Sequence, residues 1–89
     1  MNEVTYIARI VSLTNGRVGV EFPDVPSAVT EGDNREHAIE MAKEVLELVL
    51  DVQEGEVVEI NPPRTMQELE KYKELGEYEV SCELVQIKV

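Results

Sequence analysis

Residues 4–22, VTYIARIVSLTNGRVGVEF, decide the fold that this sequence predicts, because two apolar stretches flank a strong turn signal. The stretch before the turn is rich in β-branched and aromatic residues, which favour β-strands. The dipeptide Asn15-Gly16 is typical of a two-residue hairpin turn. We therefore predict two antiparallel strands, over about 3–13 and 17–22, with that turn between them.

A two-residue turn also fixes which residues of the hairpin face each other. The expected cross-strand pairs are Leu13 with Val18, Val11 with Val20 and Arg9 with Phe22. Alternate residues share a face, so one predicted face holds Ile7, Val11, Leu13, Val18, Val20 and Phe22. The other face holds Tyr6, Ala8, Ile10, Ser12, Gly19 and Glu21. Because this second face is half apolar, we expect another surface to cover it.

After the hairpin, the sequence predicts a loop, a short strand and a long helix. Two prolines make residues 23–27, PDVPS, unsuited to a central strand, and residues 28–30 can form a third strand. From 34 to about 53, apolar residues recur at helical spacing with charged residues opposite them, which indicates an amphipathic helix packed on the sheet. Asp33 is the expected N-cap, and Glu36 completes a capping box.

The remaining sequence predicts a short second helix and a last strand. Thr65 and Glu68 have the spacing of a second capping box. The final residues, 77–89, alternate in polarity as far as Leu84 and then change phase at Val85. Such a change indicates a β-bulge or a switch of the buried face, so this strand is expected to serve two surfaces.

Together these elements predict an α+β fold in the order β-β-β-α-α-β, a small antiparallel sheet with one long helix packed on one face. A chain of 89 residues suits one domain. We expect residues 1–89 to form that domain, without a separate C-terminal DNA-binding domain.

The charge of the chain narrows the classes of partner. It has 19 acidic and 8 basic residues, a formal net charge of −11 and a pI near 4.4. Residues 31–59 hold 10 of the acids and only 2 of the bases. This field repels phosphate, so we expect no direct nucleic-acid binding and a basic protein as partner. The sequence lacks a signal-peptide pattern and a membrane-length apolar run, so a cytoplasmic location without membrane contact is expected.

The stretch FPDVPSAVTEGD, residues 22–33, followed by REHAIEMAKEVLELVL, resembles the HicB-like family of antitoxins. In that family a hairpin leads into a Phe-Pro-Asp-x-Pro turn, then Thr-x-Gly-Asp and an amphipathic helix. The resemblance spans about residues 4–63 and implies a partial RNase H-like fold. It also implies the antitoxin of a type II toxin–antitoxin pair, which binds and neutralises a small, basic, mRNA-cleaving HicA-like toxin.

We expect no catalytic, cofactor or metal site, and therefore no enzyme. Arg9 is the one charged residue inside the first strand, which makes that strand a poor cradle for metal ions. His37 has no evident nucleophile or acid to work with. Cys82 has acidic neighbours, which disfavour a reactive thiolate.

The predicted sites are therefore binding surfaces. Loop residues held by a rigid sheet commonly carry recognition, so the predicted partner-binding residues are Phe22, Pro23, Asp24, Val25, Glu31 and Asp33. The half-apolar second face and the last strand predict a homodimer or higher homo-oligomer with an interface of Tyr6, Ala8, Ile10, Val85, Ile87 and Val89. Two alternatives remain open: a stand-alone oligomeric HicB-like protein without a toxin, and a weak metal-dependent nuclease that needs Asp24 and Asp33.

Overall fold

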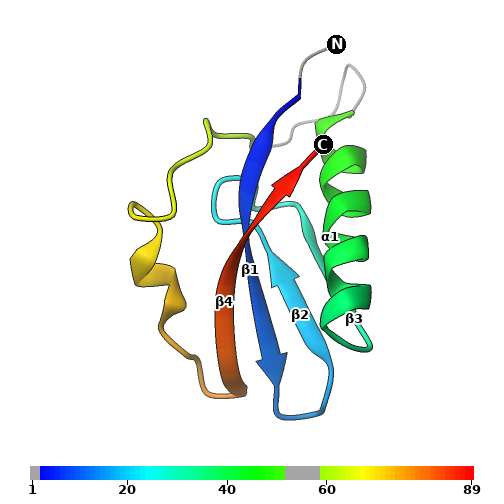
Figure 1. Ribbon diagram of the computed structural model, residues 1–89, viewed down its shortest axis with the longest axis vertical. Helices are drawn as coiled ribbons and strands as arrows, with labels where there is room; N and C mark the ends of the chain where they lie inside the picture. Colours follow the sequence, from blue (N-terminus) through cyan, green and yellow to red (C-terminus); the bar gives the residue numbers. More distant parts are fainter. Residues whose placement is uncertain (1–2, 52–58) are drawn as a thin grey trace.

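The protein folds into a four-stranded antiparallel sheet with one long helix against one face (Figure 1). The structure is a computed structural model and describes residues 3–51 and 59–89. In chain order its elements are β1 (Thr5–Leu13), β2 (Val18–Glu21), β3 (Val29–Gly32), α1 (Arg35–Leu50), the 3-10 helix η1 (Glu70–Lys73) and β4 (Glu79–Lys88). The strands lie in the order β3-β2-β1-β4, and the predicted α+β class is confirmed.

The β1–β2 hairpin turns through three residues, where two were predicted. The Gly16 N–H donates to the Leu13 carbonyl at 3.0 Å, and the Leu13 N–H donates to the Arg17 carbonyl at 2.9 Å. Gly16 has φ +89°, a left-handed conformation that suits glycine and is common at the end of three-residue hairpin loops. The extra residue shifts the register by one, so that Ile10 faces Val20 and the predicted cross-strand pairs are wrong.

This shift also overturns the predicted faces of the sheet, because a slip of one residue moves a whole strand's side chains to the other face. The face that α1 covers buries Tyr6, Ala8, Ile10, Val18 and Val20 together. The opposite face carries Ile7, Arg9, Val11, Gly19 and Glu21. The two β2 valines therefore pack with the residues that were assigned to the other side.

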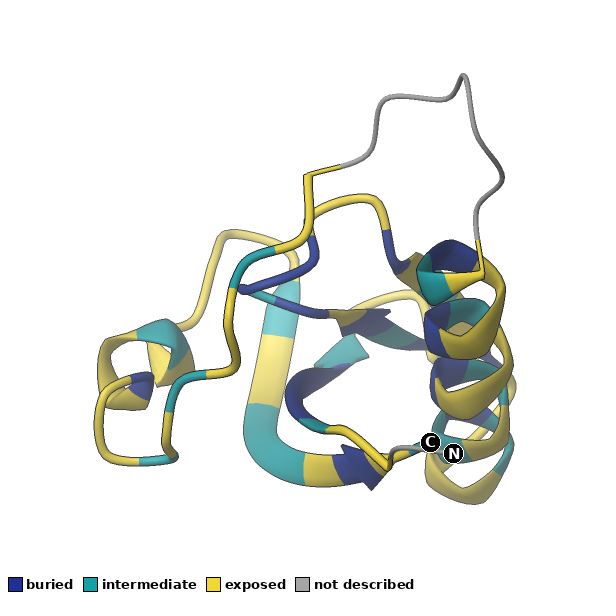
Figure 2. Ribbon diagram, turned by 90° about the horizontal axis from the view of Figure 1, so that it is seen from above, coloured by how far each residue is buried: buried dark blue, intermediate teal, exposed yellow. Residues whose placement is uncertain are grey.

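Both faces of the sheet are covered, as the view from above shows (Figure 2). The segment from Thr65 to η1 lies on the side away from α1, and its Leu69 is fully buried. The predicted capping box forms, since the Thr65 N–H donates to Glu68 Oε1 (3.0 Å) and the Glu68 N–H to Thr65 Oγ1 (3.2 Å). The helix that follows is shorter than predicted. The cap leads into turns and then into the four-residue 3-10 helix η1.

Small residues bring α1 close to β3. Ala38 and Ala42 are fully buried in this contact. A Cβ built on Gly32 would lie 2.5 Å from the Ala38 backbone nitrogen, which is closer than real Cβ atoms come to a neighbour. The helix therefore lies over the β2–β3 half of the sheet and leaves the β4 half less covered (Figure 1).

The helix begins one residue later than predicted. Its N-cap is Asn34, whose Oδ1 accepts a hydrogen bond from the His37 N–H at 2.9 Å. In return, the His37 ring Nδ1 accepts from the Asp33 N–H at 3.0 Å, so His37 takes the place that was predicted for the glutamate of the capping box. The structure gives Leu50 as the last helical residue, and the end predicted near residue 53 lies outside the described residues.

Strand β4 serves two surfaces, as its sequence pattern predicts. Val85 and Ile87 face α1, whereas Cys82 faces η1 and its Sγ donates to the Lys73 carbonyl at 3.0 Å. The register irregularity of the β1–β4 ladder lies between Ser12 and Leu13, at the start of β4 rather than at the phase change. The phase change therefore reflects a switch of the buried face within a regular stretch of strand.

Candidate partner-binding site

The turn between β2 and β3 holds the first four predicted partner-binding residues. The Val25 N–H donates to the Phe22 carbonyl at 3.0 Å, and the Ala28 N–H donates to the Val25 carbonyl at 2.9 Å, so the chain turns twice. Phe22 and Val25 are fully buried in the core. Pro23 is half-buried and Pro26 is exposed, so the two prolines form the outer surface of the turn.

Asp24 is buried at the centre of this turn and binds the segment that precedes η1. Its carboxylate accepts hydrogen bonds from the Arg64 backbone N–H (2.8 Å) and from Arg64 Nε (2.6 Å). Its carbonyl accepts from the Asn61 backbone N–H at 2.9 Å, and the Tyr6 hydroxyl donates to the Asn61 carbonyl at 2.7 Å. Because the side chain of Asp24 is only 4% exposed, its main contacts are within the chain.

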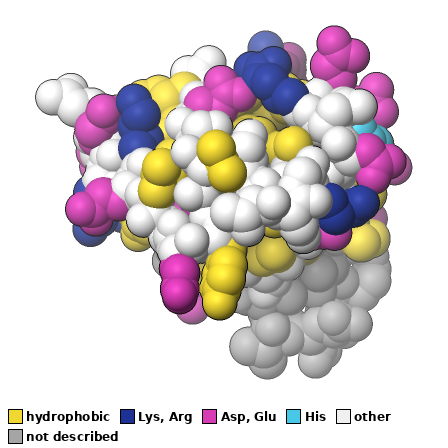
Figure 3. Space-filling view, turned by 90° about the horizontal axis from the view of Figure 1, so that it is seen from below, with side chains coloured by type: hydrophobic (Ala, Val, Ile, Leu, Met, Phe, Trp, Pro, Cys, Tyr) yellow, Lys and Arg dark blue, Asp and Glu magenta, His cyan; other side chains and the backbone are white. Residues whose placement is uncertain are grey.

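Glu31 and Asp33 lie at the other end of β3, beside the hairpin loop. Both carboxylates bind Arg17, with Glu31 Oε1 2.5 Å from Nε and Asp33 Oδ1 2.8 Å from an Nη atom. These two hydrogen bonds raise the pKa of the Arg17 guanidinium. The view from below shows acidic and basic side chains side by side on this end of the molecule, with the one histidine next to acids (Figure 3).

The structure thus separates the six predicted partner-binding residues into two groups at opposite ends of β3. Phe22, Asp24 and Val25 are buried and shape the turn, whereas Glu31 and Asp33 are exposed and Pro23 is half-buried. The surface available for a partner is therefore that of the exposed Glu31 and Asp33 and of the half-buried Pro23. Direct contact of all six with a partner stays a prediction.

The predicted oligomer interface is also mostly inside the protein. Tyr6, Ala8, Ile10 and Ile87 are buried, because α1 covers the face of the sheet on which they lie. Val85 and Val89 are half-buried at the margin of the same core. The premise that this face lies open is therefore wrong, and self-association stays a prediction without that support.

The sequence reasoning missed a buried arginine on the opposite face of the sheet. Arg9 is 5% exposed, and its guanidinium meets the Glu79 carboxylate in two hydrogen bonds of 2.6 and 3.0 Å. It also donates to the Glu74 carbonyl at 2.8 Å and to the Tyr72 carbonyl, while Glu21 lies 3.3 Å away. Arg9 therefore ties η1 and the turn after it to the centre of β1.

Arg9 strongly perturbs the acidity of its partner. The hydrogen bond from Arg9, followed by one from the Gly76 N–H, lowers the pKa of Glu79 from 4.5 to about 2. Glu79 in turn raises the pKa of Arg9. A signal for this cluster was present in the sequence, because an arginine within a buried strand is nearly always paired. Its partner, 70 residues away along the chain, had no such signal.

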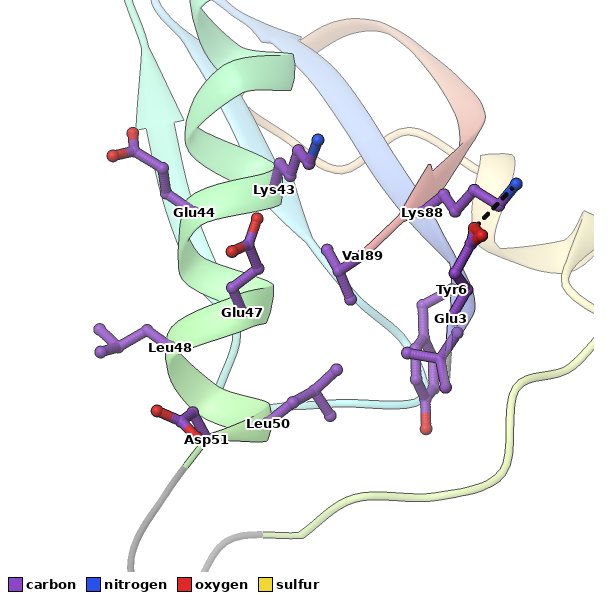
Figure 4. A pocket seen from close by; sticks show the side chains of 11 residues that line it. Glu3, Tyr6, Lys43, Glu44, Glu47, Leu48, Leu50, Asp51, Lys88 and Val89 are labelled. Atoms are coloured by element: carbon purple, nitrogen blue, oxygen red, sulfur yellow. Dashed lines mark ion pairs between the residues drawn. The ribbon is translucent and has the colours of Figure 1, made fainter. Parts of the chain in front are cut away.

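A groove lies between the C-terminal half of α1, the N-terminal end of β1 and the C-terminal end of β4 (Figure 4). Its volume is about 1000 Å³. Tyr6, Leu50 and Val89 point into it, and the charged ends of Lys43 and Glu47 stand at the helix side of its rim. On the opposite rim Lys88 Nζ pairs with Glu3 at 3.0 Å. The groove is thus apolar inside and charged at the edge.

Comparisons with known proteins found a protein that is similar to part of this chain. No protein-family model matches the chain. A segment of 46 residues, 52% of this chain, is 39% identical to a protein named Antitoxin HicB 1 from Photorhabdus laumondii subsp. laumondii. The resemblance to HicB-like antitoxins is confirmed. The matched segment spans only 30% of that antitoxin's length.

The alternative of a metal-dependent nuclease needs several converging carboxylates. Within residues 3–51 and 59–89, no three side chains of His, Cys, Asp or Glu are grouped so that they could hold a metal ion. The two acids that this alternative needs are far from free, because Asp24 binds Arg64 and Asp33 binds Arg17. In the same two ranges, no helix has the length and apolar character needed to cross a membrane.

Proposed function

We propose that this chain is the antitoxin of a type II toxin–antitoxin pair and that it binds and neutralises a small, basic, mRNA-cleaving HicA-like toxin. The observation that carries the proposal is the 39% identity to Antitoxin HicB 1. That match covers about half of this chain. The mechanism is binding, without a chemical step.

The distribution of charge supports a basic partner. The chain carries a net charge of −11, and its long helix contributes four carboxylates against two basic residues. A ribonuclease needs a positive surface to hold RNA phosphates, and carboxylates can occupy such a surface in their place. The attraction also speeds the encounter between the antitoxin and a basic toxin.

The exposed end of β3 supplies candidate contacts for this interaction. Glu31 and Asp33 share one arginine, Arg17, so their two negative charges are only partly compensated. Pro23 and Pro26 add an apolar surface at the other end of the strand. The buried turn residues between them act indirectly, by holding this edge of the sheet in one conformation.

The test uses the purified chain and the small basic protein encoded next to it. We expect that protein to cleave RNA alone and to lose this activity at about equimolar antitoxin, since specific protein–protein interfaces of standard size reach dissociation constants of roughly 10⁻⁸ M. Undiminished cleavage at a tenfold excess of the chain would contradict the proposal. Cleavage by the chain alone that depends on Mg²⁺ or Mn²⁺ would favour the nuclease alternative instead.

A further inference from the structure

The position of α1 leaves one strip of the sheet open. Because α1 lies against β3 at Gly32, it is displaced from β4 on the other side. Val85 on β4 and Val89 directly after it consequently remain half-buried although they pack against the core. The groove described above lies at one end of this strip, beside Val89.

The gap between α1 and β4 is bridged at one end and open at the end where the groove lies. Toward the start of β4, the guanidinium of Arg35 on α1 binds the Glu83 carboxylate on β4 and spans the gap between the two elements. Toward the end of β4 no such bridge between helix and strand occurs among the described residues, and the space widens to about 1000 Å³. An α-helix with its side chains is about 10–12 Å across, and a groove between packed elements is a common seat for one.

The charges around the groove discriminate between possible occupants. Its lining residues include four acids, Glu3, Glu44, Glu47 and Asp51, and two lysines, Lys43 and Lys88. A second copy of this chain would bring its own net charge of −11 to an already acidic rim. An apolar segment flanked by basic residues matches both the apolar interior of the groove and its acidic rim.

We propose that this groove docks an amphipathic helix with a basic flank, supplied by a partner protein. The apolar side of that helix packs on the half-buried Leu50 and Val89, and its basic residues face Glu47 and the acids near it. Within the described part of the chain, neither Lys43 nor Glu47 makes an ion pair, so both are available to the occupant. This inference adds a surface to the proposed function and is tested without the toxin.

The probe is a synthetic peptide of Leu and Lys, about 14 residues long or roughly 21 Å as a helix, with Leu at helical spacing. Its control has the same composition with Leu and Lys in strict alternation, which gives no apolar helix face. We expect the first peptide to shift the backbone amide resonances of residues 43–50 and 85–89 of the intact protein. Equal binding of the control, or shifts confined to other residues, would overturn the proposal.

Two rim variants give effects of opposite sign. Glu47→Lys should weaken peptide binding by about threefold, and Lys43→Glu should tighten it by a similar factor, the size expected for partly exposed charge pairs. Glu77→Lys is the matched control, because it changes the net charge as Glu47→Lys does but lies in the turn before β4. If Glu47→Lys and Glu77→Lys act alike, overall charge explains the binding and the groove does not.

Sedimentation of the chain alone completes the test. A monomer, or a dimer that still binds the peptide at the groove, agrees with the proposal. A dimer that buries the groove and excludes the peptide would make a second copy the occupant and overturn it. Neutralisation of the toxin is read in a separate assay, so a failure of the groove and a failure of the antitoxin function are distinguishable.

Discussion

The guanidinium of Arg9 and the carboxylate of Glu79 meet in two hydrogen bonds, 2.6 and 3.0 Å long, on the sheet face away from α1. The side chain of Arg9 is 6% exposed and that of Glu79 is 22% exposed. Their contact joins the middle of β1 to the first residue of β4. Arg9 also donates a hydrogen bond to the Tyr72 carbonyl and so holds η1 against the same site. A buried charge that loses its partner costs much more than an exposed one.

Glu79→Gln should therefore destabilise the protein by about 2 kcal/mol, because it leaves the buried Arg9 without its main counter-charge. The measurement is urea denaturation at neutral pH. Glu21→Gln is the matched control, since Glu21 is 51% exposed and lies 3.3 Å from the same guanidinium. We expect the control to cost less than about 0.5 kcal/mol. Equal losses for the two variants would show that Glu79 has no special role.

The same ion pair predicts how stability depends on pH. Arg9 lowers the pKa of Glu79 to about 2 in the folded protein, from 4.5. A carboxyl whose pKa is lowered on folding stabilises the protein above its unfolded pKa, and this stabilisation disappears as the pH falls toward the folded pKa. The difference in unfolding free energy between wild type and Glu79→Gln should thus shrink between pH 4.5 and about 2. A difference that stays constant over this range would contradict the assignment.

Gly32 tests how closely α1 approaches β3. In Gly32→Ala the new Cβ would lie 2.5 Å from the Ala38 nitrogen and 2.8 Å from its Cα, and backbone atoms cannot yield as a flexible side chain can. We expect a loss of about 3 kcal/mol, measured by thermal or urea denaturation, because the helix must shift away from the sheet.

Gly16→Ala provides the comparison for that variant. Nothing lies within 4 Å of a Cβ at Gly16, and the cost there arises only from its φ of +89°. The expected loss is about 1 kcal/mol. A larger loss at Gly16 than at Gly32 would mean that backbone conformation matters more than the helix–strand contact.

The sequence predicts the fold well where the signals are local. The Thr65–Glu68 capping box and the two-sided pattern of β4 are both present in the structure. The hairpin itself also forms, but its register does not follow, because Asn15-Gly16 fits a two-residue loop and a three-residue loop equally well. One residue in the loop then decides which side chains of β2 share a face with Tyr6, Ala8 and Ile10 of β1.

The candidate site was harder to predict, because its decisive contacts join residues far apart in the chain. The sequence motif around Asp24 points to recognition, yet Asp24 is 3% exposed and binds Arg64, 40 residues away. Arg9 and Glu79 are separated by 70 residues. No local spacing encodes such pairs, since they depend on how the segment before β4 crosses the sheet.

Asp24 is a buried, structural acid of the motif and Asp33 is an exposed one, so their variants should behave differently. Asp24→Asn removes the charge that holds Arg64 (2.6 Å from its Nε), and the buried site should lose about 2–3 kcal/mol of stability in urea denaturation. Asp33→Asn removes one of two acids on Arg17 at an exposed position, where the side chain of Asp33 is 70% exposed, and should cost less than about 0.5 kcal/mol.

In toxin binding we expect the reverse order, with the larger effect for Asp33→Asn and the smaller for Asp24→Asn. Binding is measured at a temperature where both variants are folded. Asp33→Asn is expected to slow association with the basic partner and to make it less sensitive to salt, because an exposed acid acts through long-range attraction. Asp24→Asn should leave association unchanged once its stability loss is allowed for. If Asp24→Asn alone weakened binding in the folded protein, the buried carboxylate would have to reach the partner directly, and the turn would have to open to expose it.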